Sequence, residues 1–490
     1  MMTLQQLLPD MALSARHAQC CVQGMRLDSR RVRDGDLFVA LGGARQDGRR
    51  FIEAAIHAGA VAVLTESDKY SEAEQGGVPV IGMPSLSAGL VDLAMRFHRN
   101  PMASLSVLGV TGTNGKSSVA WFLRDAMNAV DMPCGLIGTL GAHYGDYHDD
   151  IGHTTPDTLT LHESLAAFRD RGARYVAMEV SSHALAQDRL AGVSVNIAAF
   201  TNLSRDHLDY HGDMDGYFAA KSRLFHGHAI AGAVINTGDR YGARLAAQLA
   251  DNIRCVRVGG KDADIFCTDV QLNADGMSAR ISVAGESLSL QLPLYGRFNI
   301  DNLMIVAGML AVQGLAPNAI GAALSAVTPV PGRMQPVLAD DAPVVLVDYA
   351  HTPDALEKSL HAVREHFTGK IWCVVGCGGN RDTGKRPQMA AVAEQLADQL
   401  IFTADNPRDE SVQEIIGDML AGVQHAMAVQ VIDDRREAVR TAVLQAAPGD
   451  VVLVAGKGHE HWQEIGAKKL PMDDVSLARE ALHARHGGGQ

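Results

Sequence analysis

The sequence predicts an α/β protein of three domains, and three observations support this fold class. Short runs rich in Val, Ile and Leu alternate with longer amphipathic segments, which is the pattern of parallel strands joined by helices. The chain has 490 residues, enough for about three domains at roughly 150 residues each. A glycine-rich turn also connects one apolar run directly to an amphipathic segment, as in a strand–turn–helix unit.

The predicted domains are residues 1–97, 98–332 and 333–490. The first is a small N-terminal α/β domain. The second is a parallel-sheet domain that opens with an apolar run at 105–110 and ends at a Pro/Gly break, which is typical of a linker. The third domain is expected to form a doubly wound, Rossmann-like sheet, because apolar runs and amphipathic segments alternate along it. Its predicted strands are residues 344–347, 371–375, 400–403, 429–432 and 451–455, with helices at 353–366 and 386–399.

Composition excludes several classes of protein. Hydrophobic residues make up 47% and charged residues 20% of the chain, which argues against disorder. The net charge of −13 argues against a protein built mainly to bind nucleic acid or anionic membrane. The seven cysteines contain no Cys-x-x-Cys pair, so neither a disulfide framework nor a zinc site is indicated. With no secretory signal and no apolar run near the roughly 18 residues of a membrane span, we expect a cytoplasmic protein.

A candidate phosphate-binding loop lies at residues 109–118, GVTGTNGKSS. An apolar run precedes it, and apolar residues recur with helical spacing after it. In such a loop, backbone N–H groups close on phosphate oxygens, Lys116 reaches the β- and γ-phosphates, and Ser117 can ligate Mg²⁺. Val110 stands where the usual pattern has its first glycine, so an incidental lysine in a glycine-rich turn is the alternative. The predicted loop residues are Gly112, Thr113, Asn114, Gly115, Lys116, Ser117 and Ser118.

Acidic and histidine side chains follow two further apolar runs of the central domain. Glu179 ends the run in YVAMEVSSH, and His207 lies in FTNLSRDHLDYHG after the next run. A carboxylate at a strand end beside a phosphate loop is where nucleotide-bound Mg²⁺ needs an oxygen ligand. We therefore predict metal or phosphate roles for both, with a surface charge and an ordinary polar loop as the alternatives. Lys221 lies in an expected helix at 217–225, and from the residues alone we interpret it as a solvated helix lysine.

The third domain begins with candidate nucleotide contacts. Asp348 ends a predicted strand and His351 opens the following loop, a position suited to contact a ribose or base. Arg333 stands at the domain junction, where an arginine can reach a γ-phosphate when the domains close. An interface salt bridge is the alternative for Arg333.

Charged residues at three strand ends of the third domain predict an amino-acid pocket. Arg408, in Asp-Asn-Pro-Arg, can bind a carboxylate with two parallel hydrogen bonds. Arg381 could add a second cationic contact, and Glu460 could pair with an ammonium group. Two cations and one carboxylate at one sheet edge suit a zwitterionic amino acid. The predicted pocket residues are Arg381, Asp405, Asn406, Pro407, Arg408, Gly456 and Glu460.

The loop at 111–117, TGTNGKS, resembles the ATP loop of the Mur ligases and their folylpolyglutamate synthetase relatives, which are ATP-dependent amide-forming enzymes of three domains. The resemblance covers essentially the whole chain. It implies an N-terminal UDP-binding domain, a central P-loop ATPase-type domain and a C-terminal amino-acid-binding domain. It implies that Asn299 faces adenine and that the UDP-muramoyl-dipeptide is held by Leu27, Ser29, Thr154, Thr155, Ser181, Gln187 and Arg189. Residues 44–46 depart from a common uridine loop of the family.

The resemblance also changes the interpretation of Lys221. This lysine position is carbamylated in most Mur ligases, which turns a cation into a carboxylate-like metal ligand. With His207 at a position that helps hold a second Mg²⁺, the resemblance implies two magnesium ions bound by Ser117, Glu179, His207 and carbamylated Lys221 (N6-carboxylysine). The Asp-Asn-Pro-Arg motif ending at Arg408 is similar to the signature of members that add meso-2,6-diaminopimelate, because that acceptor carries a second carboxylate and L-lysine does not.

The implied activity is an ATP-dependent ligation in cytoplasmic peptidoglycan precursor synthesis. ATP would phosphorylate the D-Glu side chain of UDP-N-acetylmuramoyl-L-alanyl-D-glutamate, and an amine of meso-diaminopimelate would attack the acyl phosphate. The expected catalytic residues are Lys116, Glu179, His207, Lys221 and Arg333. The alternatives are an L-lysine-adding Mur ligase, a folylpolyglutamate synthetase-like ligase and, outside the class, a P-loop protein that binds nucleotide without ligation. We expect a monomer with small-molecule substrates and no nucleic-acid or membrane partner.

Overall fold

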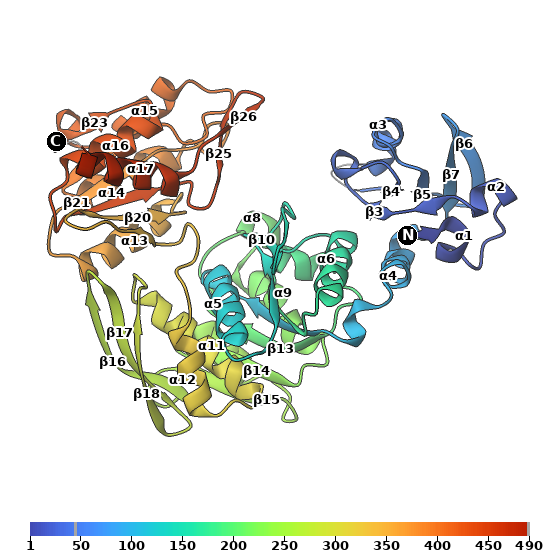
Figure 1. Ribbon diagram of the computed structural model, residues 1–490, viewed down its shortest axis with the longest axis horizontal. Helices are drawn as coiled ribbons and strands as arrows, with labels where there is room; N and C mark the ends of the chain where they lie inside the picture. The colour runs from blue at the N-terminus through green and yellow to red at the C-terminus, as the bar shows by residue number, and fades with distance from the viewer. Residues whose placement is uncertain (44–46, 488–490) are drawn as a thin grey trace. The chain divides into compact units, whose positions relative to one another are not determined.

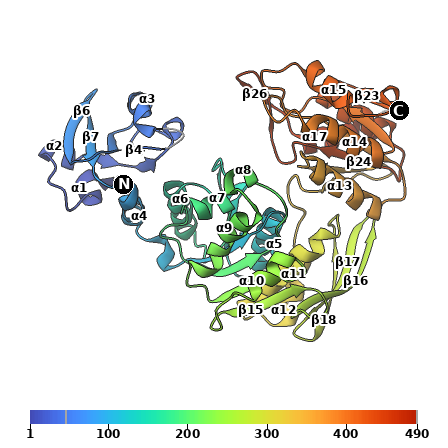
Figure 2. The same ribbon diagram turned by 180° about the vertical axis from the view of Figure 1, so that it is seen from behind.

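The computed structural model describes residues 1–43 and 47–487, drawn from two sides in Figures 1 and 2. The chain forms two compact units. One contains residues 1–116, 131–234 and 244–255, and the other contains residues 117–130, 235–243 and those from 256 onward. The sheets are mixed α/β with parallel strands, so the predicted fold class is confirmed. The predicted domain boundaries at 97 and 332 stay a prediction.

The N-terminal segment folds into a five-stranded α/β sheet. Its elements are β1 (Met2–Thr3), α1 (Leu4–Leu7), α2 (Ala15–Ala18), β2 (Cys21–Val22), β3 (Gly24–Arg26), η1 (Ser29–Arg31), β4 (Asp36–Ala40), η2 (Gly48–Phe51), α3 (Ile52–His57), β5 (Ala62–Glu66), β6 (Ser71–Gln75), β7 (Val78–Met83), α4 (Leu86–Phe97) and η3 (Pro101–Ala103). The strand order is β3-β4-β5-β7-β6, parallel except for β6. Leu37 and Val39 pack in one core, whereas Phe38 and Ala40 pack in another. Both faces of β4 are therefore buried, as in parallel sheets generally.

The central sheet places the phosphate loop at the end of a middle strand. Its elements are β8 (Ser106–Thr111), α5 (Lys116–Asn128), β9 (Cys134–Gly138), β10 (Gly141–Tyr144), β11 (Tyr147–Asp149), α6 (Thr158–Asp170), β12 (Tyr175–Glu179), α7 (Ser182–Ala186), β13 (Val195–Phe200), α8 (Leu208–His211), α9 (Met214–His226), β14 (Gly232–Asn236), α10 (Arg240–Ala246), β15 (Arg254–Gly259), β16 (Ile265–Asn273), β17 (Gly276–Val283), β18 (Glu286–Leu292), α11 (Phe298–Val312) and α12 (Pro317–Ser325). The strand order is β11-β10-β9-β12-β8-β13-β14-β15-β16-β17-β18.

Strands β9, β12, β8 and β13 run parallel, so their carboxyl ends meet at one edge of the sheet. The phosphate loop follows β8 and leads into α5, as predicted. The predicted helix at 217–225 lies within α9. This edge, where the strand order reverses around β8, is where ligands bind in open α/β sheets.

The C-terminal sheet is doubly wound, as predicted. Its elements are β19 (Gln335–Val337), β20 (Val344–Asp348), α13 (Pro353–His366), β21 (Ile371–Val375), α14 (Lys385–Leu396), β22 (Gln399–Phe402), α15 (Val412–Leu420), η4 (Ala426–Ala428), β23 (Gln430–Val431), α16 (Arg435–Gln445), β24 (Val451–Ala455), β25 (Trp462–Ile465), β26 (Lys468–Pro471) and α17 (Asp474–Gly487). The strand order is β19-β20-β24-β21-β22-β23, parallel except for β19, and β25 pairs with β26 in a separate hairpin.

The pattern of buried side chains shows that both faces of this sheet are covered. Along β24, Leu453 packs in one core and its neighbours Val452 and Val454 pack in another. All five predicted strands are present. The helix predicted at 386–399 ends earlier, at Leu396, because Gln399 already begins β22. Among residues 1–43 and 47–487, no helix combines the length and apolar character needed to cross a bilayer.

Candidate functional site

The phosphate loop is held in shape by the chain that follows β13. Gly112 has φ 151°, and a Cβ there would lie 1.8 Å from Thr201 Oγ1, so only glycine fits without displacing Thr201. Thr201 Oγ1 donates to the Asn114 carbonyl at 2.6 Å, and the Asn114 N–H donates to Asn202 Oδ1 at 3.0 Å. These hydrogen bonds hold the loop backbone in a defined conformation.

Two lysines converge on one carbonyl of this loop. The Gly112 oxygen accepts from Lys116 Nζ at 2.9 Å and from Lys221 Nζ, on α9, at 2.6 Å. Lys221 is 1% exposed, and its Nζ lies 4.6 Å from the centre of the Tyr217 ring. Burial lowers the pKa of Lys221 well below its usual value, and Lys116 lowers it further, while Asp206 opposes the shift. Lys221 is thus no solvated helix lysine, which corrects the interpretation from the residues alone.

Glu179 is a buried carboxylate in a defined orientation. It ends β12 and is 1% exposed. Thr139, which follows β9, donates its backbone N–H to Glu179 Oε1 at 2.8 Å and its hydroxyl to Oε2 at 3.2 Å. Thr139 also pairs with Thr154 across 3.1 Å between hydroxyl oxygens. The sequence reasoning missed Thr139, although its place directly after a buried apolar run was a usable signal.

Histidine and tyrosine rings cluster after β12 and β13. The His183 ring centre lies 4.8 Å from that of His207 and 5.5 Å from that of His211. His211 stacks on Tyr217, and its Nε2 is 2.9 Å from Ser182 Oγ. Burial lowers the pKa of both His183 and His211. In the described parts of the chain, no three His, Cys, Asp or Glu side chains are placed to hold a metal together, so His207's metal role stays a prediction.

The residues predicted to bind the muramoyl peptide form one hydrogen-bond network beside Glu179. Thr155 Oγ1 donates to the Glu179 carbonyl at 2.8 Å and accepts from the Ser181 N–H at 3.0 Å. Arg189 donates through Nη1 to the Thr155 carbonyl and through Nε to Gln187 Oε1, both at 3.0 Å. The structure brings these residues together at the strand ends, whereas their binding role remains a prediction.

Two further residues predicted to bind the UDP-muramoyl-dipeptide lie in the N-terminal segment. Leu27 and Ser29 are half-buried and follow β3 directly. Arg26, just before them, pairs with Asp36 at 3.1 Å and with Glu163 on α6. This pairing fixes the end of β3 against α6. The departing residues 44–46 lie outside the described residues.

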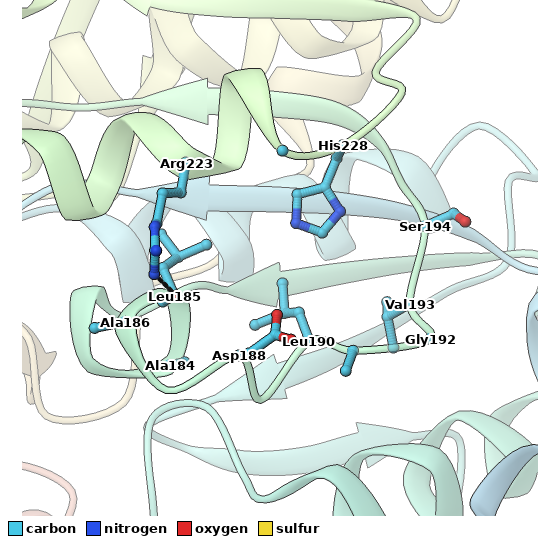
Figure 3. A pocket seen from close by; sticks show the side chains of 12 residues that line it. Ala184, Leu185, Ala186, Asp188, Leu190, Gly192, Val193, Ser194, Arg223 and His228 are labelled. Carbon is cyan, nitrogen blue, oxygen red and sulfur yellow. Dashed lines mark hydrogen bonds between the residues drawn. The ribbon is translucent and has the colours of Figure 1, made fainter. Parts of the chain in front are cut away.

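A hollow lies beside α7, apart from the predicted site residues. This hollow of about 660 Å³ is lined by α7, the segment after it and the end of α9 (Figure 3). Arg223 lines the hollow and donates to the Leu185 carbonyl at 3.0 Å. Asp188 and His228 also line it. None of the predicted site residues lines this hollow.

In the C-terminal part, Asp348 organises the segment that carries Arg333. Its buried carboxylate accepts from the Met334 N–H at 2.7 Å and from Ser359 Oγ at 3.0 Å. Burial raises the pKa of Asp348, and the positive charge of Arg333 opposes this shift. The Arg333 guanidinium lies 4.6 Å from the Tyr349 ring centre. The contacts of Asp348 thus orient the backbone next to Arg333.

The other predicted nucleotide contacts differ in exposure. His351 is exposed, its Nδ1 lies 2.7 Å from the Tyr349 carbonyl, and partial burial of the ring lowers its pKa. Asn299 is buried in the first turn of α11. Its Nδ2 donates to the Tyr295 carbonyl at 2.9 Å, and its Oδ1 accepts from Asn302 at 3.0 Å. Both polar atoms of Asn299 therefore already have partners in the protein.

The predicted amino-acid pocket is assembled around Arg408. Arg408 has φ 53°, a left-handed conformation that is costly for a residue with a Cβ. Its Nε donates to Glu464 Oε2 and its Nη1 donates to the Gly379 carbonyl, both at 2.9 Å. Arg381 is exposed in the loop next to Gly379. That loop is fastened by buried Arg386, which donates to the Gly378 carbonyl and pairs with Glu410.

A buried lysine holds the anionic side of the same pocket. Lys457 is 0% exposed, and its Nζ donates to Asn406 Oδ1 at 2.9 Å and to Glu460 Oε2 at 3.0 Å. Asn406 Nδ2 donates to the same Glu460 oxygen at 2.8 Å. Gly456 has φ 117°, and a Cβ there would lie 2.6 Å from Asp405 Oδ2. Lys457 was missed, although it stands beside Gly456 at a strand end.

Three descriptions of the Mur ligase family match the chain in succession. They are "Mur ligase family, catalytic domain" at residues 22–98, "Mur ligase middle domain" at 110–310 and "Mur ligase, glutamate ligase domain" at 332–458. A protein of Coxiella burnetii named UDP-N-acetylmuramoyl-L-alanyl-D-glutamate--2,6-diaminopimelate ligase is 45% identical over 486 residues, covering 98% of this chain and 99% of the relative. A Pseudomonas aeruginosa protein of the same name is 43% identical, covering 99% of this chain and 98% of the relative.

Solved structures show the same similarity. A structure titled as a UDP-N-acetylmuramoyl-L-alanyl-D-glutamate--2,6-diaminopimelate ligase matches with a TM-score of 0.67 and 33% identity, covering 99% of both chains. A Mycobacterium tuberculosis folylpolyglutamate synthase complexed with ADP matches with a TM-score of 0.62 and 19% identity, covering 82% of this chain and 95% of the other. The second likeness shows a shared fold alone.

Proposed function

The chain belongs to the Mur ligase family of ATP-dependent amide ligases, and we propose that it joins meso-2,6-diaminopimelate to UDP-N-acetylmuramoyl-L-alanyl-D-glutamate in peptidoglycan precursor synthesis. Relatives with that name cover nearly the full chain at 43–46% identity. The arginine and carboxylate of the predicted amino-acid pocket support this choice of acceptor. ADP and phosphate would be the other products.

The observation that carries the ligase chemistry is the convergence of Lys116 and Lys221 on the Gly112 carbonyl. Two ammonium groups this close repel each other unless anions lie between them or one is neutral. A nucleoside triphosphate would supply the negative charge that Lys116 binds. A neutral Lys221 amine can add CO₂ to form a carbamate, which replaces a positive charge by a negative one.

The donor set fits magnesium, which prefers oxygen ligands. The Glu179 carboxylate is buried and oriented, Ser117 offers a hydroxyl in the first turn of α5, and carbamylated Lys221 would add two oxygens. His207 would complete the set. When bound, Mg²⁺ would neutralise negative charge on the phosphoryl oxygens.

The protein's own part in the reaction is mainly to bind and orient its substrates. Lys116 and the loop N–H groups would hold the triphosphate while the D-Glu carboxylate attacks the γ-phosphorus and ADP leaves. Arg333 would contact the transferred phosphoryl group when the domains close. The acceptor amine would then attack the acyl carbon, so that a C–N bond forms, the C–O bond to phosphate breaks, and the amine loses a proton. Exclusion of water would protect the acyl phosphate from hydrolysis.

In the pocket, Arg408 would bind the second carboxylate of diaminopimelate and Glu460 the neighbouring ammonium. Glu460 Oε2 is occupied by Lys457 and Asn406, which orients the carboxylate. L-Lysine offers the ammonium but not the carboxylate, so it would leave Arg408 without its ligand.

The test is phosphate release from ATP with Mg²⁺ and UDP-N-acetylmuramoyl-L-alanyl-D-glutamate, with meso-diaminopimelate or L-lysine added in parallel. We expect release that depends on diaminopimelate and is much lower with lysine. A preference for lysine would keep the ligase and overturn the assignment of Arg408. Tight ATP binding without release for either acceptor would overturn the ligase assignment in favour of a non-ligating nucleotide-binding protein.

A further inference from the structure

The loop that carries Arg408 is attached to the β25–β26 hairpin through backbone hydrogen bonds. The Arg408 N–H donates to the Glu464 carbonyl at 3.0 Å, and the Gly466 N–H donates to the Arg408 carbonyl at 2.7 Å. Arg408 and Ile465 thereby form a parallel bridge, and the Glu464 N–H donates to Asn406 Oδ1 at 2.9 Å. These bonds do not involve the side chain of Glu464, so they survive its replacement.

The Glu464 side chain has a separate task, because it sets the direction of the Arg408 guanidinium. Glu464 Oε2 accepts from Nε, and the Gly379 carbonyl accepts from Nη1, each at 2.9 Å. The guanidinium is planar, so two fixed points on it fix the whole fork and leave Nη2 for a ligand. The two side chains are 23% and 26% exposed, so the fork can still be reached by a small solute.

Glu464 has a second cationic neighbour within the hairpin. Glu464 Oε1 lies 3.7 Å from Lys469 Nζ, and that ammonium lies 4.3 Å from the centre of the Trp462 ring. Glu464 thus faces one cation on each carboxylate oxygen. Without it, the long Arg408 side chain would regain rotamers and lose a charge-assisted hydrogen bond.

We propose that Glu464 is a specificity-determining positioning residue, which acts through Arg408 to favour an acceptor with a second carboxylate over L-lysine. This inference rests on the function proposed above and extends it to a residue outside the Asp-Asn-Pro-Arg segment. Glu464 does not itself contact the acceptor. It holds the guanidinium where the carboxylate meets it, so that binding requires no reordering of the arginine.

Lys457 offers a matched control inside the same pocket. It orients Asn406 and Glu460, and Glu460 is assigned to the ammonium that both acceptors share. Weakening this side should therefore affect diaminopimelate and lysine alike. The two residues have distinguishable kinetic signatures, since one changes selectivity and the other changes overall acceptor use.

The experiment compares Glu464→Ala, Glu464→Gln, Lys457→Met and Lys469→Met in the full-length protein. The readouts are kcat/KM for meso-diaminopimelate and for L-lysine, the KM values for the other two substrates, and thermal unfolding. Glu464→Ala should lower the diaminopimelate-to-lysine ratio about tenfold, mainly through KM for diaminopimelate. Glu464→Gln should retain most of the ratio, because its amide oxygen can still accept from Nε. Lys457→Met should lower both values with little change in the ratio, and Lys469→Met should change neither by more than about twofold.

An unchanged or raised ratio in a folded Glu464→Ala protein would overturn the inference, and so would an equal loss with both acceptors. If Glu464→Ala does not fold, Glu464→Asp replaces it, because the shorter side chain withdraws the carboxylate while keeping its charge; an unchanged ratio there would also overturn the inference. If the unaltered protein shows no preference for diaminopimelate, the proposed function fails together with this extension. A preference that survives in Glu464→Ala removes the extension alone.

Discussion

The phosphate loop and the amino-acid pocket both lie at carboxyl ends of parallel strands, but their charges are arranged differently. At the phosphate loop, Lys116 and Lys221 point at the same carbonyl oxygen. In the pocket, Arg408 pairs with Glu464 and Lys457 pairs with Glu460. The first region brings two amines to one oxygen, which suits the binding of negatively charged ATP and the formation of a carbamate. The second is already balanced, which suits selection of one acceptor by geometry.

The largest expected effect comes from substitutions at the phosphate loop. Lys221→Ala and Lys221→Arg should each reduce diaminopimelate-dependent phosphate release by about 10³-fold, because neither side chain can form a carbamate and preorganised charge is a major part of catalysis. Lys358→Arg, an exposed helix lysine paired with Asp354, is the matched control and should keep full activity. Release from Lys221→Arg within tenfold of the unaltered protein would contradict the carbamate. Trapping of labelled CO₂ on the unaltered protein checks the same point directly.

The next largest effect comes from a substitution in the amino-acid pocket. Arg408→Ala should reduce kcat/KM for meso-diaminopimelate about 100-fold, because a charge-assisted pair with the second carboxylate is lost. L-Lysine should change by less than about threefold, since it has no group for Arg408 to bind. Arg440→Ala, an exposed arginine paired with Glu437, serves as control and should behave like the unaltered protein. Steady-state kinetics with both acceptors measure these changes. An equal loss of kcat/KM for both acceptors would rule out the contact between Arg408 and the second carboxylate.

One glycine in each region tests how rigid the two backbones are. Gly112→Ala should lower the free energy of unfolding by about 2 kcal/mol and weaken ATP binding, because its Cβ would overlap Thr201. Gly456→Ala should cost less, since the atom it meets is the end of the Asp405 side chain. Gly89→Ala in α4, where a Cβ meets nothing within 4 Å, should be neutral or slightly stabilising. Urea unfolding with and without ATP measures all three, and a larger loss for Gly456→Ala would reverse the comparison.

The smallest expected effect concerns a buried histidine that joins the segment before α11 to α13. His366 Nε2 accepts from the Gly296 N–H at 2.9 Å, so Nδ1 carries the proton and donates to the Asn273 carbonyl at 2.9 Å. Burial lowers the pKa of His366, whereas the bond to Asn273 and the charge of Glu365 oppose the shift. Between the lowered pKa and about 6.5, the unfolded chain binds more protons than the folded chain. Stability should therefore fall as the pH drops below about 6.5.

Unfolding by urea between about pH 5 and pH 8 measures this contribution. His366→Gln should lose the part of the slope that His366 contributes, because an amide does not titrate in this range. His361→Gln, an exposed histidine on α13, is the control and should keep the slope. An identical slope in the two variants would contradict the role assigned to His366.

Much of the fold could be predicted from the sequence because its signals are local. Both faces of β20, β21 and β24 are buried, so these strands appear in the sequence as continuous apolar runs. The phosphate loop is a contiguous strand, turn and helix, so Lys116 could be predicted to lie at a helix start. Glu179, Asp348 and Arg408 were found because the ends of parallel strands share an edge of the sheet.

The state of the site residues could not be predicted in the same way. Lys221 contacts a carbonyl 109 positions away, Thr139 reaches Glu179 over 40 positions, and Arg408 meets Glu464 over 56. Such contacts depend on the order in which strands assemble.

The sequence by itself determined the α/β class, the strands and the positions of the phosphate and acceptor motifs, because these follow from residue spacing along the chain. The tertiary structure alone decided which charges are buried and which are paired. It placed Lys221 and Lys457 out of solvent and set Glu464 against Arg408. Burial and pairing change the energy of a charge far more than its neighbours in sequence do, and they arise only when distant segments pack together.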